Sequence, residues 1–229
     1  MQPIKIIFHI CALHETVTNI ADELVDHIIW SGLYDAATAI HITISGREPH
    51  VTKLEKHMSH VGSKIVMHSR PYDESYERVT LLDARRYITE DDLVLYIHSK
   101  GVLHIGMETA SNVRDWRKYL SYHLVKKWKS CVHLLEHGNA HVVGVNFQHE
   151  PRPHFSGNFW WARGDYYLTL PATIGDGYTD PEFYVCQLAK SCNIKNIFST
   201  HIDHYRIRYP TAYYIDSARL DTRDDASKT

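Results

Sequence analysis

The chain contains no long hydrophobic run, and its sequence therefore predicts no membrane-spanning helix. Spanning a bilayer takes roughly 18 consecutive apolar residues, and no stretch approaches that length. The opening segment "MQPIKIIFHICALHE" has one lysine and an apolar run too short for a signal peptide. We therefore expect a soluble, cytoplasmic protein without a transmembrane segment.

Paired cysteines and excess positive charge are also missing. The four cysteines form no Cys-x-x-Cys pair, which favours buried free thiols over a zinc or disulfide framework. Lysine and arginine total 25 against 27 acidic residues, a formal net charge of −2. We expect no nucleic-acid partner, because no basic excess is available to bind a phosphate backbone. Histidine is unusually frequent, with 18 residues.

Three familiar motifs are absent from the sequence. Without GxxxxGK[ST] the chain has no P-loop, and without GxGxxG after a strand it has no dinucleotide-binding fingerprint. The absence of HExxH argues against a zinc hydrolase of that type. A nucleotide diphosphate held in another way remains compatible with the sequence.

What the sequence does contain is an alternation of strand-like and helix-like segments. Residues 4–13 form a nearly continuous β-branched run, which is typical of a strand buried on both faces. The alternation predicts an α/β protein with a mainly parallel central sheet flanked by helices. The expected strands are 4–13, 39–45, 64–69 and 92–98, and the expected helices are 16–33, 50–62 and 74–88.

The second half of the chain is less regular. We expect a helix over 111–135 and another over 181–192, with strands over 141–147 and 194–200. At 229 residues the length fits one domain, which we place at residues 1–215. Residues 216–229 contain hardly any apolar side chains and are expected to form a flexible tail or a linker to a further domain.

Polar residues follow the predicted strands where a ligand site is expected. In open parallel sheets, ligands bind beyond the carboxyl ends of the strands. The fourth strand ends in His98, Ser99, Lys100 and Gly101, and the first strand ends in the segment containing Leu13. An ammonium group next to a glycine suits a phosphate, because the glycine lets the backbone approach closely. The alternative is that these strands simply end in polar turns.

Three segments, "LYIHSKG", "DWRKYL" and "FSGNFWWAR", give the chain a family resemblance. With the four-strand α/β start, they resemble GT-A nucleotide-sugar glycosyltransferases, and more narrowly the rhamnan-synthesis type found in large algal viruses. The resemblance implies a single GT-A (Rossmann-like) domain that transfers a hexose, such as rhamnose or glucose, from a UDP- or dTDP-sugar to a glycan or glycoprotein acceptor. It also implies a viral protein acting in the host cytoplasm.

The sequence departs from the GT-A pattern at the metal site. These enzymes usually place Asp-x-Asp at the end of this strand, where the present chain reads His98-Ser99-Lys100. One hypothesis is that His98 and a distant histidine such as His201 or His204 bind Mn²⁺ or Mg²⁺. The other is that Lys100 neutralises the diphosphate directly and lessens the need for metal.

The resemblance also nominates donor and acceptor residues. Arg117 would bind the leaving diphosphate, because guanidinium groups bind oxygens in pairs. Arg78 would contact the nucleoside or the sugar, and Asn158 would bind sugar hydroxyls. Trp160 and Trp161 point to opposite sides of a strand, so one could pack in the core while the other offers a flat face to an acceptor sugar.

A catalytic carboxylate is expected in "GDGYTDPEFYV", residues 175–185. Inverting transfer needs a base near the acceptor hydroxyl, and the resemblance nominates Asp180 or Glu182. Asp180 also precedes a proline in the manner of a helix N-cap, which is a structural alternative.

Two further function classes stay open at the level of sequence. The missing Asp-x-Asp and the many aromatic residues are compatible with a carbohydrate-binding module that performs no reaction. The histidine content suggests a metallohydrolase, although no tight ligand cluster is visible.

Overall fold

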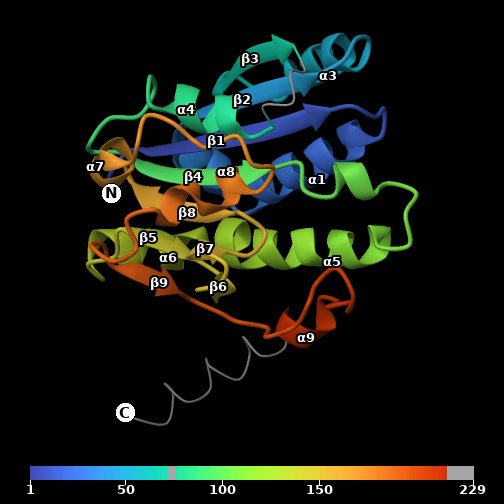
Figure 1. The fold of residues 1–229 in the computed structure, drawn as a ribbon. Helices are drawn as coiled ribbons and strands as arrows, with labels where there is room; N and C mark the ends of the chain where they lie inside the picture. The colour runs from blue at the N-terminus through green and yellow to red at the C-terminus, as the bar shows by residue number, and fades with distance from the viewer. Residues whose placement is uncertain (72–75, 216–229) are drawn as a thin grey trace, which may run out of the picture.

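A seven-stranded sheet forms the centre of the molecule in the computed structural model, which describes residues 1–71 and 76–215. The strand order is β3-β2-β1-β4-β8-β5-β9, running from β3 at the top of Figure 1 to β9 at the bottom. Its strands are β1 (Ile4–Ala12), β2 (Ala37–Gly46), β3 (Ile65–Pro71), β4 (Leu93–His98), β5 (Val142–Gly144), β8 (Trp160–Arg163) and β9 (Ile194–Asn196).

The sheet is parallel except at one strand. β1 pairs in parallel with both β2 and β4, and β5 pairs in parallel with β9. β8 lies between β4 and β5 and is antiparallel to both. The predicted α/β architecture with a mainly parallel sheet is therefore confirmed, and the reversed strand is a feature that the sequence pattern did not predict.

Helices cover both faces of this sheet. The α-helices are α1 (Val17–Trp30), α2 (Leu33–Ala36), α3 (His50–Met58), α4 (Arg78–Ala84), α5 (Ala110–Ser121), α6 (Trp128–Glu136), α7 (Gly164–Thr169), α8 (Asp180–Phe183) and α9 (Ala212–Ile215). Side chains of α1, α3, α5 and α6 share one apolar cluster with one face of β1. Side chains of α4 and α7 share a second cluster with the other face. Alternation along β1 assigns Phe8 to the first cluster and Ile7 to the second.

Several predicted elements are shorter or interrupted. The helix expected over 111–135 consists of α5, a π-helical turn η2 (Tyr122–Lys126) and α6. The helix expected over 181–192 is the single turn α8 followed by a 3₁₀ turn η3 (Tyr184–Cys186). The segment 141–147 divides into β5 and the start of β6 (Phe147–Gln148), which pairs with β7 (His154–Phe155).

Among the described residues, no helix is long and apolar enough to cross a bilayer. The predicted tail, residues 216–229, lies outside the described residues.

Candidate active site

A cavity of about 100 Å³ lies at the carboxyl edge of β1 and β4 and contains Lys100. The two strands are hydrogen-bonded neighbours, and His9 of β1 pairs with His98 of β4. Residues 98–104 form one wall, residues 76–77 before α4 form another, and Tyr178, Glu182 and Tyr205 close the cavity from distant segments. We call it the Lys100 cavity. The strand end that the sequence singled out therefore does lie at a cavity.

The ammonium of Lys100 is buried without a hydrogen-bond acceptor. Its side chain is 7% exposed, and among the described residues it makes no ion pair or hydrogen bond. Its Nζ lies 3.8 Å from the centroid of the Trp116 ring and 5.7 Å from that of Tyr205. Burial lowers the pKa of Lys100, while the carboxylates of Glu182 and Glu77 act in the opposite direction. A buried cation in this position favours an anionic ligand.

Glycine is required where the chain leaves β4. Gly101 has a φ of +97°, and a Cβ there would lie 3.0 Å from Val113 Cγ1 and 3.2 Å from Arg117 Nη1. The turn is tied to β1 by two hydrogen bonds, because Ser99 N donates to the His9 carbonyl and Ser99 Oγ accepts from Cys11 N. The predicted residues Ser99, Lys100 and Gly101 are thereby brought together at the cavity wall.

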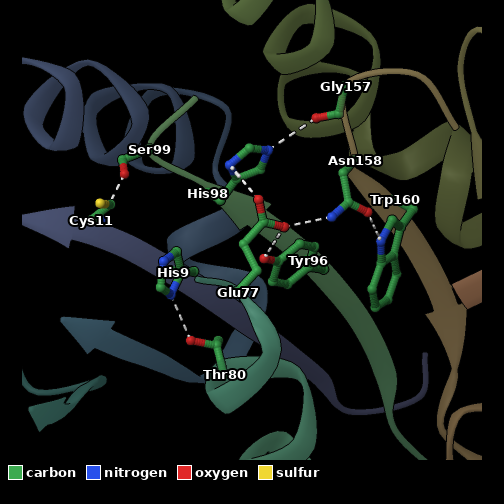
Figure 2. Close-up of polar contacts among 10 residues, drawn as sticks. All are labelled: His9, Cys11, Glu77, Thr80, Tyr96, His98, Ser99, Gly157, Asn158 and Trp160. Carbon is green, nitrogen blue, oxygen red and sulfur yellow. Dashed lines mark hydrogen bonds and ion pairs between the residues drawn. The ribbon is translucent and has the colours of Figure 1, made fainter. Parts of the chain in front are cut away.

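Glu77 lines the same cavity, and its carboxylate is the centre of a polar network (Figure 2). Glu77 Oε2 accepts from Tyr96 Oη at 2.8 Å and from Asn158 Nδ2 at 2.5 Å. Asn158 Oδ1 in turn accepts from Trp160 Nε1 at 3.0 Å. The network joins α4, β4 and β8. No sequence pattern had indicated that Glu77 belongs to the site.

His98 sits between two oxygen atoms of this network. Its Nε2 lies 3.1 Å from the Gly157 carbonyl, and its Nδ1 lies 3.2 Å from Glu77 Oε1 (Figure 2). Burial lowers the pKa of His98 to about 3, so the ring is neutral and has one proton to donate. That proton goes to the Gly157 carbonyl, which can only accept. Nδ1, which faces Glu77 Oε1, then has no proton of its own.

The two candidate base residues differ in their surroundings. Asp180 accepts a hydrogen bond from Arg152, which lowers its pKa, and another from Gly177 N at 2.9 Å. It therefore stabilises the loop before α8. Glu182 lines the Lys100 cavity, and its carboxylate makes no hydrogen bond or ion pair among the described residues. Of the pair nominated from sequence, Glu182 is the carboxylate available for chemistry.

Both predicted arginines are engaged elsewhere. Arg117 is 5% exposed, pairs with both carboxylate oxygens of Glu23 on α1 at 3.0 and 3.1 Å, and donates to the Lys100 carbonyl. Arg78 donates through Nε to the Gly175 carbonyl at 2.6 Å and through Nη2 to the Gly177 carbonyl. Each guanidinium is hydrogen-bonded to backbone at or next to the cavity wall. Neither is therefore placed to make the direct contact with the donor that the sequence had predicted.

A wider groove lies on the other side of Gly101. Its volume is about 410 Å³, and Arg114 and Arg117 line it together with Thr16 and Ser111 from the starts of α1 and α5. Arg114 is exposed and has no hydrogen bond or ion pair in the described part of the chain. The family resemblance nominated Arg117, whereas in the described part of the chain it is the Arg114 guanidinium whose donors have no partner.

The donor and acceptor roles predicted for three residues around β8 do not fit their burial. Trp160 and Trp161 are 1% and 0% exposed and belong to the two opposite apolar clusters. They do point to opposite sides, but both sides of the sheet are covered, so neither ring offers a face to a sugar. Asn158 is 1% exposed, and its amide is used within the Glu77 network. Leu13 is half-buried after β1 and does not line the cavity.

The predicted metal ligands are not assembled into a metal site. Both ring nitrogens of His98 have partners, and His204 Nε2 lies 2.8 Å from Thr200 Oγ1 and 3.2 Å from Asn146 Nδ2. His204 stacks on Trp116 with ring centroids 5.1 Å apart. Over residues 1–71 and 76–215, no group of three or more His, Cys, Asp or Glu side chains is placed to hold a metal ion.

Comparisons with solved structures agree with the fold. Glucosyl-3-phosphoglycerate synthase from Mycobacterium tuberculosis, solved with Mn²⁺, UDP and phosphoglyceric acid, matches with a TM-score of 0.51 at 16% identity, over 86% of this chain and 68% of that chain. Another structure of the same enzyme matches with a TM-score of 0.51 at 15% identity, over 93% and 75%. At this level of identity the likenesses concern the fold alone, a mainly parallel sheet flanked by helices.

Sequence comparisons give a narrower result. No curated protein sequence matches the chain. Residues 12–173 match a family described as "Domain of unknown function (DUF8361)". This range begins at Ala12, the last residue of β1, and includes β2 to β4, the Lys100 turn and the Glu77 network, but ends before Glu182. The chain is therefore a member of the DUF8361 family.

Proposed function

We propose that the protein is a glycosyltransferase that takes a sugar from a nucleotide-diphosphate donor, with UDP-sugar as the first candidate. The observation on which this depends is the buried Lys100 ammonium, which lies at the carboxyl edge of a parallel sheet and lacks an acceptor in the described chain. A diphosphate supplies the oxygens that this ammonium lacks. The fold shared with nucleotide-sugar transferases supports the same donor class.

In the proposed reaction, which inverts the anomeric centre, Lys100 and Glu182 have separate roles. The bond between the anomeric carbon and the donor oxygen breaks, and its electron pair passes to the diphosphate, whose charge Lys100 offsets. The acceptor hydroxyl oxygen forms the new bond to the anomeric carbon. Its proton passes to the carboxylate of Glu182, which faces the same cavity. The Glu77 network fixes the end of β4 and does not touch the reacting atoms.

The narrower predictions remain proposals. The rhamnan-synthesis resemblance makes rhamnose the first donor sugar to test and glucose the second, with a glycan as acceptor. Tyr178 and Tyr205, which line the cavity and are 63% and 41% exposed, replace Trp160 and Trp161 as the aromatic residues available to a sugar ring.

The test is a thermal-shift panel on the full chain with UDP, dTDP, CDP, ADP and their common sugar conjugates. We expect UDP or dTDP and their sugar conjugates to raise Tm, and unphosphorylated uridine to have a much smaller effect. Calorimetry with glycans in the absence of nucleotide tests the alternative. Glycan binding with no response to any nucleotide would assign the protein as a carbohydrate-binding module.

A further inference from the structure

The cavity contains a fixed positive charge in the region where a metal-using transferase needs negatively charged ligands. Divalent cations such as Mn²⁺ and Mg²⁺ bind carboxylate and other oxygen ligands, or neutral imidazole. An ammonium at the same place repels a divalent cation and contributes no ligand. The solved relative contains Mn²⁺ and UDP together, so the absence of acidic residues at 98–100 here is a chemical difference from a metal-binding strand end.

Three of the other candidate ligands around the cavity already have partners. His98 contacts oxygens through both ring nitrogens, and Ser99 Oγ accepts from Cys11 N. Glu77 accepts from Tyr96 and Asn158 through one oxygen and contacts His98 through the other. Glu182 is then the one carboxylate on the cavity wall without a partner in the described chain. A single free carboxylate is too few for a dedicated metal site.

The surroundings of Lys100 suit an ammonium that takes over the charge of a metal ion. Its ammonium is held against Trp116 and near Tyr205, whose ring faces attract a cation but leave its three N–H groups free for oxygen atoms. Gly101 also lines the cavity, and its φ of +97° is what allows the chain to turn directly after Lys100. Across Gly101, Arg114 supplies a second positive charge with no partner among the described residues.

We infer that this protein binds its nucleotide diphosphate without a divalent cation, with the Lys100 ammonium in place of the metal. The inference rests on the proposed function, because it specifies how the same cavity holds the donor.

Calorimetric titration of UDP into the full chain tests this, once in excess EDTA and once with Mn²⁺ added. We expect the two Kd values to agree within about threefold. Binding that needs Mn²⁺, or tightens by more than about tenfold with it, overturns the inference while leaving the proposed function intact. An absence of UDP or dTDP binding under both conditions overturns the proposed function itself.

A pair of variants connects the result to Lys100. Lys100→Met should weaken UDP binding by more than about tenfold, with and without Mn²⁺, because it removes the charge that faces the phosphates. Lys53→Met, at an exposed position of α3, is the matched control and should bind as the wild type does. Unchanged UDP affinity in a folded Lys100→Met variant contradicts the inference. If that variant does not fold, the wild-type Kd values for UDP in EDTA and in Mn²⁺ still test the inference.

Discussion

Lys100 and Glu182 differ from the other charged side chains around the cavity because, within the described residues, neither charged group makes a hydrogen bond or an ion pair. Arg78, Arg117 and Asp180 all hold loops or helices together through hydrogen bonds. A buried charge without a partner is costly to fold, so its presence in a cavity points to a ligand or a reaction. At the scale of single residues, a charged side chain is therefore available to a ligand only where other residues of the protein do not already bond to it.

The first prediction concerns Glu182. Glu182→Gln should lower kcat by about 10²-fold or more and change the donor KM by less than about threefold, because the amide cannot accept the acceptor's proton. Initial rates of nucleotide release from the sugar donor measure both constants. Glu150→Gln, at an exposed position, is the control and should behave as the wild type. An unchanged kcat in Glu182→Gln would assign the base to another group.

The second prediction separates the hydrogen-bond acceptors of Glu77 from its charge. Glu77→Ala removes the acceptor for Tyr96 and Asn158 and should destabilise the fold by about 3 kcal/mol. Glu77→Gln should cost less than about 1 kcal/mol, because its amide oxygen still accepts from both residues and its NH2 group can donate to His98 Nδ1. Urea unfolding of both variants at neutral pH measures the difference. Equal, large losses in both would mean that the network depends on the charge of Glu77 and not on its acceptor atoms alone.

At the scale of elements, the turn from β4 to α5 positions Lys100. Two glycines in this connection have positive φ values, +97° at Gly101 and +79° at Gly106. They differ in surroundings, because a Cβ at Gly101 meets Val113 and Arg117 whereas a Cβ at Gly106 meets nothing within 4 Å. Comparing alanine substitutions at the two glycines therefore separates the cost of the steric contact from the cost of the backbone conformation.

The third prediction uses this pair. Gly101→Ala should destabilise the protein by about 3 kcal/mol, since backbone strain and the contact with Val113 add together. Gly106→Ala should cost about 1 kcal/mol, from backbone strain alone. Urea unfolding gives both free energies, and UDP titration should show a loss of affinity in Gly101→Ala alone. Equal free-energy costs would mean that the turn adjusts to the added methyl group.

The interrupted helix between α5 and α6 shows what element-level patterns miss. The apolar spacing over 111–135 predicts one helix, and no proline or glycine occurs there to break it. The π-helical turn η2 places Tyr122 and His123 against Tyr214 from the far end of the chain. Tertiary contacts of this kind override the local preference for a regular α-helix.

At the scale of the whole molecule, the histidine content predicts sensitivity to acid. Burial lowers the pKa of six histidines from 6.5 to values of about 3 or 4, and these are His9, His27, His41, His98, His123 and His204. Between pH 6.5 and about 4 the unfolded chain binds protons that the folded chain does not. Stability therefore falls as the pH falls through this window.

The fourth prediction gives this a magnitude. Each buried neutral histidine should remove about 1.4 kcal/mol of stability per pH unit below 6.5, until its folded pKa is reached. Urea midpoints at pH 7.5, 6.5 and 5.5 check the trend, which should be shallow over the first interval and steep over the second. His41→Gln should reduce the slope, whereas the exposed His60→Gln should leave it unchanged. A constant midpoint down to pH 5 would contradict the burial of neutral imidazoles.

The sheet, its mainly parallel order and the location of the candidate site at the end of β4 follow from local patterns. A β-branched run of residues predicts a buried strand, and the polar residues 98–101 mark where that strand ends. Glu77 gave no such signal, because a glutamate near a helix start is ordinary. Its role depends on Tyr96, His98 and Asn158, which reach it across 19 to 81 residues of sequence.

The sequence by itself determined the α/β class and the edge of the sheet where Lys100 lies, because periodicity and strand ends are properties of neighbouring residues. Only the tertiary structure decided which side chains remain available there. Arg117 pairs with Glu23 across 94 residues, and Arg78 donates to Gly175 across 97. Trp160 and Trp161 lost their predicted role because helices cover both faces of β8. Hydrogen-bond partners and burial come from segments distant in the chain, and no local pattern records them.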